Sequence, residues 1–467
     1  MAPSPGKLIL NDMGAFHAYD IRGVYGKDFD KDTVYKVGYF IPGLLGADKV
    51  LVGRDCRVSS REMRDALVKG ICDAGADVYD LGLSSTPLVY FATANYGFKA
   101  SVQITASHNP AEYNGMKVSR ENALPVGLDS GLGQIEQWIK ECRPTPVAEN
   151  PGKVMDYDVK GEYIAFLMRF KGDYSNLRIA FDLSNGMANL FAKEIYGGED
   201  ASFLFDEIDG RFPNHDPNPL IARNVEPLQK EVLRTGADVG VIYDGDADRV
   251  MFVDEKGGFV APDLVIALMS RYFIGERGEK NPRVLQEIRS SKAVSEYLTA
   301  LGCDVHTWRV GRAYAAPKLR EIDGLWGGEL AGHYYFKDFF YSDSGMLASM
   351  IVLRIVAGLK KEGRTLSEAM AEIAGYRNSG EINFKVEDKR GAMEAAREFF
   401  ESRVKADKLM DFDGYRLEFK DWWFNIRPSN TEPYLRFICE AVSDDILEKR
   451  IAEVTEIISK RFGGEKA

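Results

Sequence analysis

KVLVGRDCRVSSREMRDALVKGICDAGADVYDL, residues 49–81, contains an apolar strand, an amphipathic helix and the start of a second apolar strand. Residues 49–55 predict the first strand, and Ser59 and Glu62, which have capping-box spacing, predict where the helix begins. Gly75 predicts its end. The apolar face of the helix is formed by Met63, Leu67, Val68, Ile71 and Cys72. Strand, helix and strand in this order are typical of an α/β sheet.

The helix-ending glycine of this segment recurs along the chain. Gly-Ala-Asp-Val occupies 75–78 and 236–239, and Gly-Cys-Asp-Val occupies 302–305, each between an amphipathic helix and an apolar strand. Three such junctions indicate repeated α/β modules. Loop-like segments lie near 143–152, 253–262 and 375–380, and the last of them precedes a smaller α+β unit. We therefore predict four domains, over 1–150, 151–253, 254–374 and 375–467.

The composition is that of a globular protein, since 45% of the 467 residues are hydrophobic and the net charge is −11. The negative charge argues against nucleic acid or an anionic membrane surface as the main partner. No apolar run reaches the ~18 residues of a membrane span, and the run in residues 1–10 is too short for a signal peptide. The five cysteines are scattered and form no C-x-x-C pair, which argues against a disulfide framework or a zinc site. We expect a cytoplasmic protein, and a monomer because no apolar stripe suggests an interface.

An acidic motif, Asp244-Gly245-Asp246-Ala247-Asp248-Arg249, follows the apolar residues 239–243. Alternate residues of an extended chain point the same way, so three carboxylates converge and their repulsion favours a bound cation. Mg²⁺ prefers such oxygen ligands and also binds phosphate oxygens. An EF-hand begins in the same way, and Glu255 stands at its twelfth position, but Arg249 replaces the glycine of the sixth position and strands flank the motif. An acidic surface turn stays open as an alternative.

Three further loops carry polar groups. TASHNP (105–110) follows an apolar strand and carries Ser107 and His108; it lacks the hydrolase pattern G-x-S-x-G, and by itself it is more typical of a polar turn. RPSNTEP (427–433) offers a guanidinium, hydroxyls and backbone N–H groups for a phosphate, although a helix cap or turn explains it equally well. GGELAGH (327–333) either presents Glu329 and His333 to a hydroxylated ligand or holds a locally bonded histidine.

These four motifs, in this order and spacing, resemble those of the α-D-phosphohexomutase family, specifically its phosphomannomutase/phosphoglucomutase branch. The resemblance covers essentially the whole chain, and YDIRG (19–23), VGRDCR (52–57) and NGMK (114–117) also match family patterns. It implies an α/β fold in which three similar mixed-sheet domains and a smaller C-terminal α+β domain surround a central cleft. It also implies interconversion of hexose 6-phosphate and hexose 1-phosphate, of mannose or glucose, through a phosphoserine and a hexose 1,6-bisphosphate intermediate.

The resemblance further implies a role for each site residue. Ser107 would carry the phosphoryl group and, with Asp244, Asp246 and Asp248, bind Mg²⁺. The other residues expected near the reacting group are Arg22, Lys117, His108 and Arg249. Those expected to bind the sugar or the phosphate of the hexose phosphate substrate are Glu329, His333, Arg312, Arg427, Ser429, Asn430, Thr431 and Arg436.

Two residues depart from the family pattern. Ala331 stands where the sugar loop usually has serine, and Arg312 stands where this branch often has histidine, so the preferred sugar is open. Phosphoglucosamine mutase is the nearest alternative, although that branch usually has glycine where Asn430 stands. Alternatives of other kinds are a Mg²⁺-dependent sugar phosphatase with an aspartate nucleophile and a non-catalytic sugar-phosphate binding protein.

Overall fold

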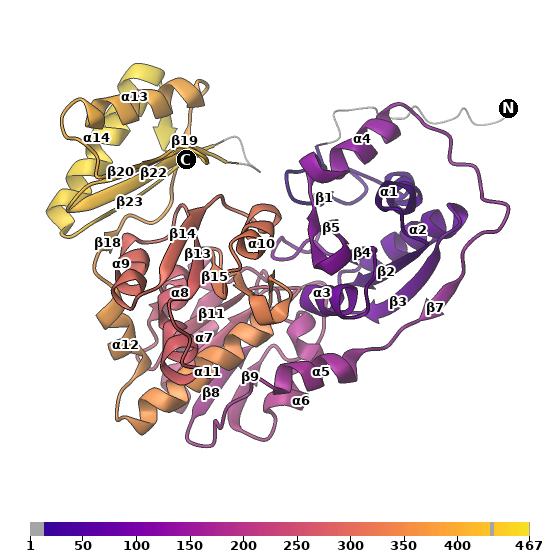
Figure 1. Ribbon diagram of the computed structural model, residues 1–467, viewed down its shortest axis with the longest axis horizontal. Coiled ribbons are helices and arrows are strands. Elements are labelled where there is room, and N and C mark those ends of the chain that lie inside the picture. Colours follow the sequence, from indigo (N-terminus) through magenta and orange to yellow (C-terminus); the bar gives the residue numbers. More distant parts are fainter. Residues whose placement is uncertain (1–13, 430–433, 467) are drawn as a thin grey trace.

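The computed structural model describes residues 14–429 and 434–466, and these ranges contain four β-sheets, each with its own helices (Figure 1). The first three sheets are mixed and the fourth is antiparallel, which confirms the predicted fold class. In Figure 1 the first sheet and the fourth lie on opposite sides of the second and third. None of the helices in the described ranges has the length and apolarity that a bilayer crossing requires.

The first sheet contains the predicted strand–helix–strand segment, residues 49–81. Its strand order is β1 (Ile21–Val24), β5 (Tyr113–Arg120), β4 (Ala100–Ile104), β2 (Lys49–Arg54), β3 (Asp77–Leu83) and β7 (Val154–Asp156), and β6 (Pro125–Val126) pairs with β5. Its helices are α1 (Lys31–Leu45), α2 (Ser60–Asp73), α3 (Thr86–Asn95) and α4 (Leu132–Lys140). The strand, the helix and the left-handed Gly75 that ends it are confirmed. The capping box is wrong, because the Ser59 hydroxyl accepts a hydrogen bond from the Asn114 amide instead of capping α2.

The second and third sheets share one plan, in which parallel central strands continue into antiparallel ones. The second has the order β12 (Phe259–Val260), β11 (Val250–Asp254), β10 (Val239–Tyr243), β8 (Arg178–Asp182) and β9 (Asp200–Leu204). The third has the order β14 (Asp304–Trp308), β13 (Arg283–Glu287), β15 (Trp326–Gly328), β16 (Tyr334–Phe336) and β17 (Ser342–Asp343). The helices of this region are α5 (Lys160–Met168), α6 (Ala192–Tyr196), α7 (Ala222–Thr235), α8 (Pro262–Leu268), α9 (Lys292–Ala300), α10 (Arg312–Glu321), α11 (Gly345–Lys361) and α12 (Leu366–Ile373). Gly236 and Gly302 are left-handed before β10 and β14, as predicted.

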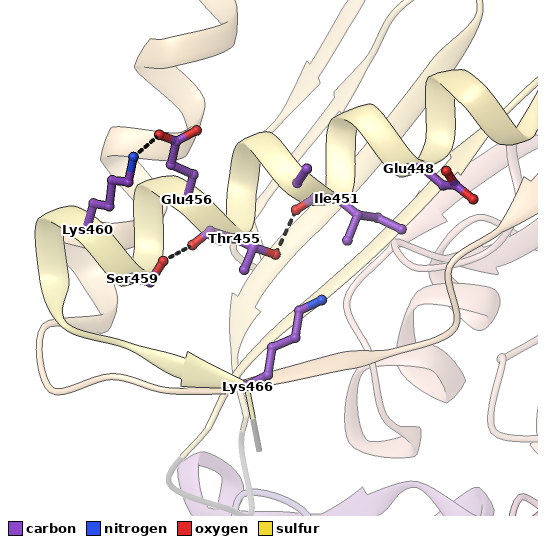
Figure 2. Close-up of a pocket in the computed structure, with 8 residues that line it drawn as sticks. Glu448, Ile451, Thr455, Glu456, Ser459, Lys460 and Lys466 are labelled. Carbon is purple, nitrogen blue, oxygen red and sulfur yellow. Dashed lines mark hydrogen bonds and ion pairs between the residues drawn. The ribbon is translucent and has the colours of Figure 1, made fainter.

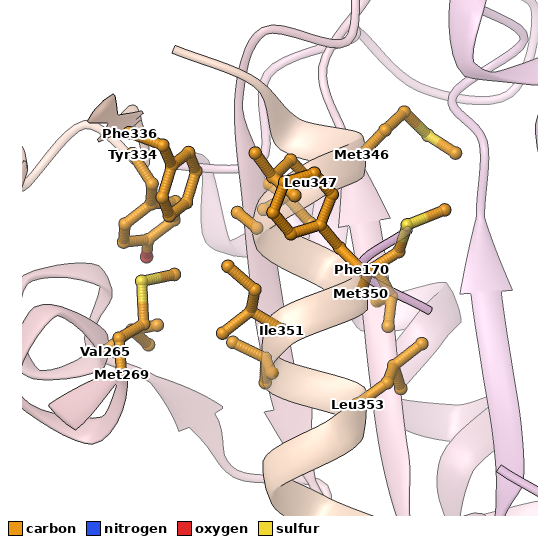
Figure 3. Packing of buried hydrophobic residues seen from close by; sticks show 14 of the residues in the cluster. Phe170, Val265, Met269, Tyr334, Phe336, Met346, Leu347, Met350, Ile351 and Leu353 are labelled. Carbon is orange, nitrogen blue, oxygen red and sulfur yellow. The ribbon is translucent and has the colours of Figure 1, made fainter. Parts of the chain in front are cut away.

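Helix α11 joins the second and third sheets into one apolar core. It follows the third sheet in sequence but packs on β10 and β11 of the second. Figure 3 shows Phe170 beside Met350 on one side of the helix, and Met269 and Tyr334 on the other. Because both sheets bury side chains against the same helix, the loops at their ends hold a constant relative position.

The fourth sheet has the order β20 (Lys408–Met410), β21 (Tyr415–Glu418), β22 (Trp422–Pro428), β23 (Leu435–Ala441), β19 (Ile382–Lys385) and β24 (Glu465–Lys466), and β18 (Arg377–Asn378) pairs with β23. Helices α13 (Lys389–Glu401) and α14 (Asp444–Phe462) cover it. Figure 2 shows a groove of about 480 Å³ along α14, lined by residues such as Ile451 and Thr455. None of the predicted site residues lines this groove.

Replacing Leu347 with alanine tests the shared core. Leu347 is fully buried in α11, so its removal leaves a cavity that is expected to cost about 2–5 kcal/mol. Thermal unfolding should show a clearly lower Tm. The matched control, Leu233→Ala, removes the same group from a side chain that is 61% exposed and should leave the Tm nearly unchanged. Equal melting of the two variants would contradict a shared core around α11.

Candidate active site

Ser107 lies in the loop that follows β4, and its backbone is left-handed, with φ of 52°. The segment is a turn, in which the Asn109 N–H donates to the Ala106 carbonyl at 3.1 Å, and Ser107 within it is fully buried. Its hydroxyl donates to Asp244 Oδ2 at 2.8 Å, and His108 Nδ1 lies 3.4 Å from the Ser107 hydroxyl oxygen. Arg22 reaches the loop from β1, where its guanidinium donates to Asn109 Oδ1 at 2.8 Å.

The three aspartates follow β10 and bring one ligand oxygen each to within 4.8 Å of one another. All three are fully buried, so the alternative of an acidic surface turn is wrong. Asp246 Oδ1 and Asp248 Oδ1 are buried without a hydrogen-bond partner among the described residues. Buried carboxylate oxygens that lack donors are suited to a hard divalent cation, which needs oxygen ligands.

The charged groups at and around the three aspartates have shifted pKa values. Burial, and then the charges of Asp246 and Asp248, raise the pKa of Asp244 well above its usual value. Lys117 Nζ binds Asp246 Oδ2 at 2.7 Å and also binds Asp248. Burial opposes the charge on Lys117, but Asp246 and Asp248 outweigh it and raise its pKa. Burial, and then Arg249, Arg22 and Lys117, lower the pKa of His108 well below its usual value, so its imidazole is neutral at pH 7.

The serine loop and the aspartate loop come from different sheets and touch directly. A Cβ on Gly245 would lie 2.6 Å from the Ser107 carbonyl oxygen, so only glycine permits this approach. Thr86, at the start of α3, donates its backbone N–H to the Asp246 carbonyl at 3.1 Å and its hydroxyl to the Asp246 carboxylate. The first and second domains therefore meet at the Ser107 hydroxyl.

The third sheet adds the loop between β15 and β16. Glu329 is buried there and accepts from the Tyr335 hydroxyl at 2.7 Å, and burial raises its pKa. His333 Nε2 accepts from Arg249 Nε at 2.9 Å, and Nδ1 lies 2.6 Å from Asp343 Oδ2. Arg312 Nε lies 3.0 Å from the other oxygen of Asp343. The predicted sugar loop is thus joined to the aspartate loop through Arg249.

The fourth domain places Arg427 at the end of β22. Arg427 is 3% exposed, and its Nε and Nη1 have no hydrogen-bond partner within the described ranges. Burial, and then the charge of Arg289, lower its pKa, although Asp413 Oδ1 lies 3.6 Å from Nη1 and opposes that shift. Arg436 forms an ion pair with Glu381 at 3.2 Å, and the Ser429 N–H donates to the Tyr434 carbonyl at 2.9 Å. Asn430 and Thr431 lie outside the described residues.

Comparison with known proteins agrees with this geometry. Models of the phosphoglucomutase/phosphomannomutase α/β/α domains I, II and III match residues 13–144, 162–258 and 261–376, and the C-terminal domain of that family matches 381–457. The chain is 34% identical to a phosphomannomutase of Methanocaldococcus jannaschii, over 97% of this chain and 99% of that one. The chain belongs to the phosphoglucomutase/phosphomannomutase family.

Two further comparisons support the assignment to this family. A phosphomannomutase of Escherichia coli K12 is 32% identical over 97% of this chain and 100% of its own length. The crystal structure of a phosphoglucomutase/phosphomannomutase family protein from Burkholderia thailandensis has a TM-score of 0.83 and 27% identity, covering 96% of this chain and 97% of that one.

In this phosphohexomutase the loop that carries Ser107 is held by Arg57, the last residue of VGRDCR. The sequence did not predict that role. Arg57 is 2% exposed and pairs with the buried Asp55 at 3.1 Å. Its two terminal nitrogens donate at 2.6–3.0 Å to the carbonyl oxygens of Ser107, Asn109, Pro110 and Tyr113. Because one guanidinium binds four carbonyl groups of the loop, it holds the loop in its left-handed turn. The spacing of residues along the sequence does not predict such a contact.

The contacts of Glu255, the residue at the twelfth position of an EF-hand loop, also exclude an EF-hand. Glu255 directs its carboxylate away from the aspartates and accepts from the Ser367 N–H at 3.1 Å, as well as from the Ser367 hydroxyl. It binds the first turn of α12, where a carboxylate interacts favourably with free N–H groups.

Replacing Arg57 with alanine tests the loop contact. The change leaves Asp55 buried without its partner, and losing one member of a buried ion pair typically costs about 3–5 kcal/mol. A marked fall in Tm is expected. Arg61→Ala, on the exposed side of α2, is the control and should melt like the parent protein. An unchanged Tm for Arg57→Ala would show that the guanidinium does not hold the loop.

Proposed function

We propose that this chain is a phosphohexomutase that interconverts hexose 6-phosphate and hexose 1-phosphate, of mannose or glucose or both. The observation that carries the proposal is the Ser107 hydroxyl, buried and hydrogen-bonded to one of three converging aspartates. A serine in that place suits a phosphoryl carrier, because phosphoryl transfer needs positioning and charge stabilisation more than covalent chemistry.

The proposed cofactor is Mg²⁺, held by Asp244, Asp246, Asp248 and an oxygen of phosphorylated Ser107. When bound, it would neutralise charge on the transferred phosphoryl group. The oxygens of Asp246 and Asp248 that accept no hydrogen bond from the described part of the chain support this assignment.

In the proposed reaction a sugar hydroxyl attacks the phosphorus of phosphorylated Ser107. The bond from phosphorus to Ser107 Oγ breaks, the hydroxyl loses its proton, and Oγ gains one. The product is a hexose 1,6-bisphosphate, which turns over and returns its other phosphoryl group to Ser107. The groups that would stabilise charge or move protons are the neutral His108, 3.4 Å from Ser107 Oγ, and the cations that bind Asp246, Asn109 and Asp244, namely Lys117, Arg22 and Arg249.

Substrate binding is assigned to the third and fourth domains. Glu329 and His333 would contact sugar hydroxyls, and Arg427, Ser429, Asn430, Thr431 and Arg436 would bind the phosphate that is not transferred. Two nitrogens of Arg427 have no hydrogen-bond partner among residues 14–429 and 434–466, which supports an anion there, because leaving buried donors unpaired is costly. Each phosphate of the bisphosphate must bind this site in turn. A site that recognises phosphate by its charge and by the paired N–H groups of arginine can accept either one.

Intact mass tests the phosphoryl carrier. After incubation with a hexose 1,6-bisphosphate, the wild type should gain one phosphoryl group, whereas Ser107→Ala should gain none and lose isomerisation. Ser175→Ala, an exposed serine of the second domain, should behave as the wild type. Steady release of inorganic phosphate by both the wild type and Ser107→Ala would instead indicate a phosphatase. A preference for glucosamine phosphate in parallel assays would favour the phosphoglucosamine alternative.

Calorimetry with MgCl₂ tests the metal site. A cation that binds only the folded protein raises its stability, so Mg²⁺ should bind the wild type and raise its Tm. Asp246→Asn, which removes one ligand charge, should weaken binding strongly. Glu255→Gln should retain it, because that carboxylate binds Ser367. Loss of Mg²⁺ binding in Glu255→Gln, with Asp246→Asn unaffected, would overturn the assigned ligand set.

A further inference from the structure

Arg312 departs from the family pattern, and its surroundings give it a different role from the predicted contact with substrate. It is the first residue of α10, after Gly311, whose φ of 109° an L side chain rarely adopts. The guanidinium has four neighbours, and the longest of its hydrogen bonds is to Ser342 Oγ, 3.5 Å from Nη2. Nε donates to Asp343 Oδ1 at 3.0 Å, Nη2 donates to the Ala123 carbonyl at 2.7 Å, and the group lies 3.7 Å from the centre of the Tyr90 ring.

Asp343 divides its carboxylate between two partners. One oxygen binds Arg312, and the other lies 2.6 Å from His333 Nδ1. Asp343 is fully buried, so a carboxylate held at both oxygens in this way has little freedom to rotate. The orientation of the His333 ring therefore depends on where Arg312 holds Asp343.

The hydrogen bond from Arg249 Nε to His333 Nε2 determines which nitrogen of the His333 ring carries the proton. Arg249 Nε carries hydrogen in every accessible state of arginine, so His333 Nε2 must accept from it at 2.9 Å. The proton of the neutral ring then lies on Nδ1 and is donated to Asp343. Arg312, Asp343, His333 and Arg249 form one chain that ends at Asp244, 3.7 Å from Arg249 Nε.

Two of the contacts of Arg312 come from the first domain. Tyr90 lies in α3, and Ala123 precedes β6, whereas Ser342 and Asp343 belong to β17 of the third sheet. Tyr90 is 1% exposed and stacks on the guanidinium, an arrangement that strengthens when water is excluded. Contacts from the first domain as well as the third therefore hold Arg312 beside Asp343.

We propose that Arg312 is a positioning residue that fixes His333 as its Nδ1–H tautomer through Asp343, and that it links this alignment to the contact between the first and third domains. The proposal rests on the proposed mutase function for its kinetic consequence. The tautomer does not depend on that function and can be measured without substrate.

The experiment compares Arg312→Ala with the wild type in two measurements. Histidine-selective ¹⁵N NMR reads the tautomer, and the signal of His333 is assigned among the five histidines by its loss in His333→Gln. We expect the Nδ1–H signature in the wild type and a mixture with Nε2–H in Arg312→Ala. In the mutase assay kcat should fall about 10- to 100-fold, the range typical of outer partners of a functional histidine, with KM little changed. Arg312→Lys restores a cation beside Asp343 and should therefore recover part of the Nδ1–H signature and part of kcat.

Arg320→Ala is the matched control. Arg320 lies on the same helix, donates to the Asn122 carbonyl of the first domain at 3.3 Å and stacks on Tyr341, but its recorded partners do not include Asp343 or His333. It should leave the tautomer and kcat unchanged. If Arg312→Ala does not fold, Arg312→Gln, which keeps more of the side chain, provides the same measurements.

Three results would overturn the proposal. The Nδ1–H signature could persist without Arg312, or kcat could stay at the wild-type value. A rise in KM at constant kcat would instead make Arg312 a direct substrate contact. A wild type without mutase activity would remove the proposed function, and the tautomer comparison would still decide whether Arg312 positions His333.

Discussion

The burial of three carboxylates side by side is the constraint on which the rest of the structure depends. Asp244, Asp246 and Asp248 are fully buried, and each charge that leaves water without compensation costs several kcal/mol. The second domain, which carries the aspartates, does not supply all of the compensation itself. Lys117 comes from the first sheet, and His333, which orients Arg249, comes from the third. The cluster is therefore stable only where several domains meet.

This arrangement explains why the connections between domains are polar near the site and apolar away from it. Away from the site, α11 joins the second and third sheets through close packing. Near it, the first domain is attached through Thr86, Ser107 and Ala123, by hydrogen bonds with defined directions to Asp246, Asp244 and Arg312. The fourth domain is attached to the third by Arg416, which donates to the carbonyls of Ile288 and Ser290 at 2.8 and 2.5 Å. Directional contacts fix the orientation of reacting groups, which apolar packing alone does not specify.

The amino-acid sequence by itself determined the local elements and the chemical character of the loops. Strand β2 and helix α2 follow from apolar periodicity, and the glycines at 75, 236 and 302 follow from the left-handed turn that ends a helix. The carboxylate cluster was predictable because alternation along an extended chain is a local rule. The motifs at Ser107, Asp244 and Arg427, taken together, also identified the family.

Only the tertiary structure decided which partner each polar side chain takes. Ser59 binds Asn114 instead of capping α2, Glu255 binds Ser367 instead of a metal loop, and Arg312 binds Asp343. Arg57 and Asp343 carry no spacing signal, because their partners lie in other elements of the chain. Local rules act over a few residues, whereas these contacts depend on strand register and on how domains dock. That is why the sequence indicated the chemistry of the site, and the fold determined the orientation of His333 and the surroundings of Ser107.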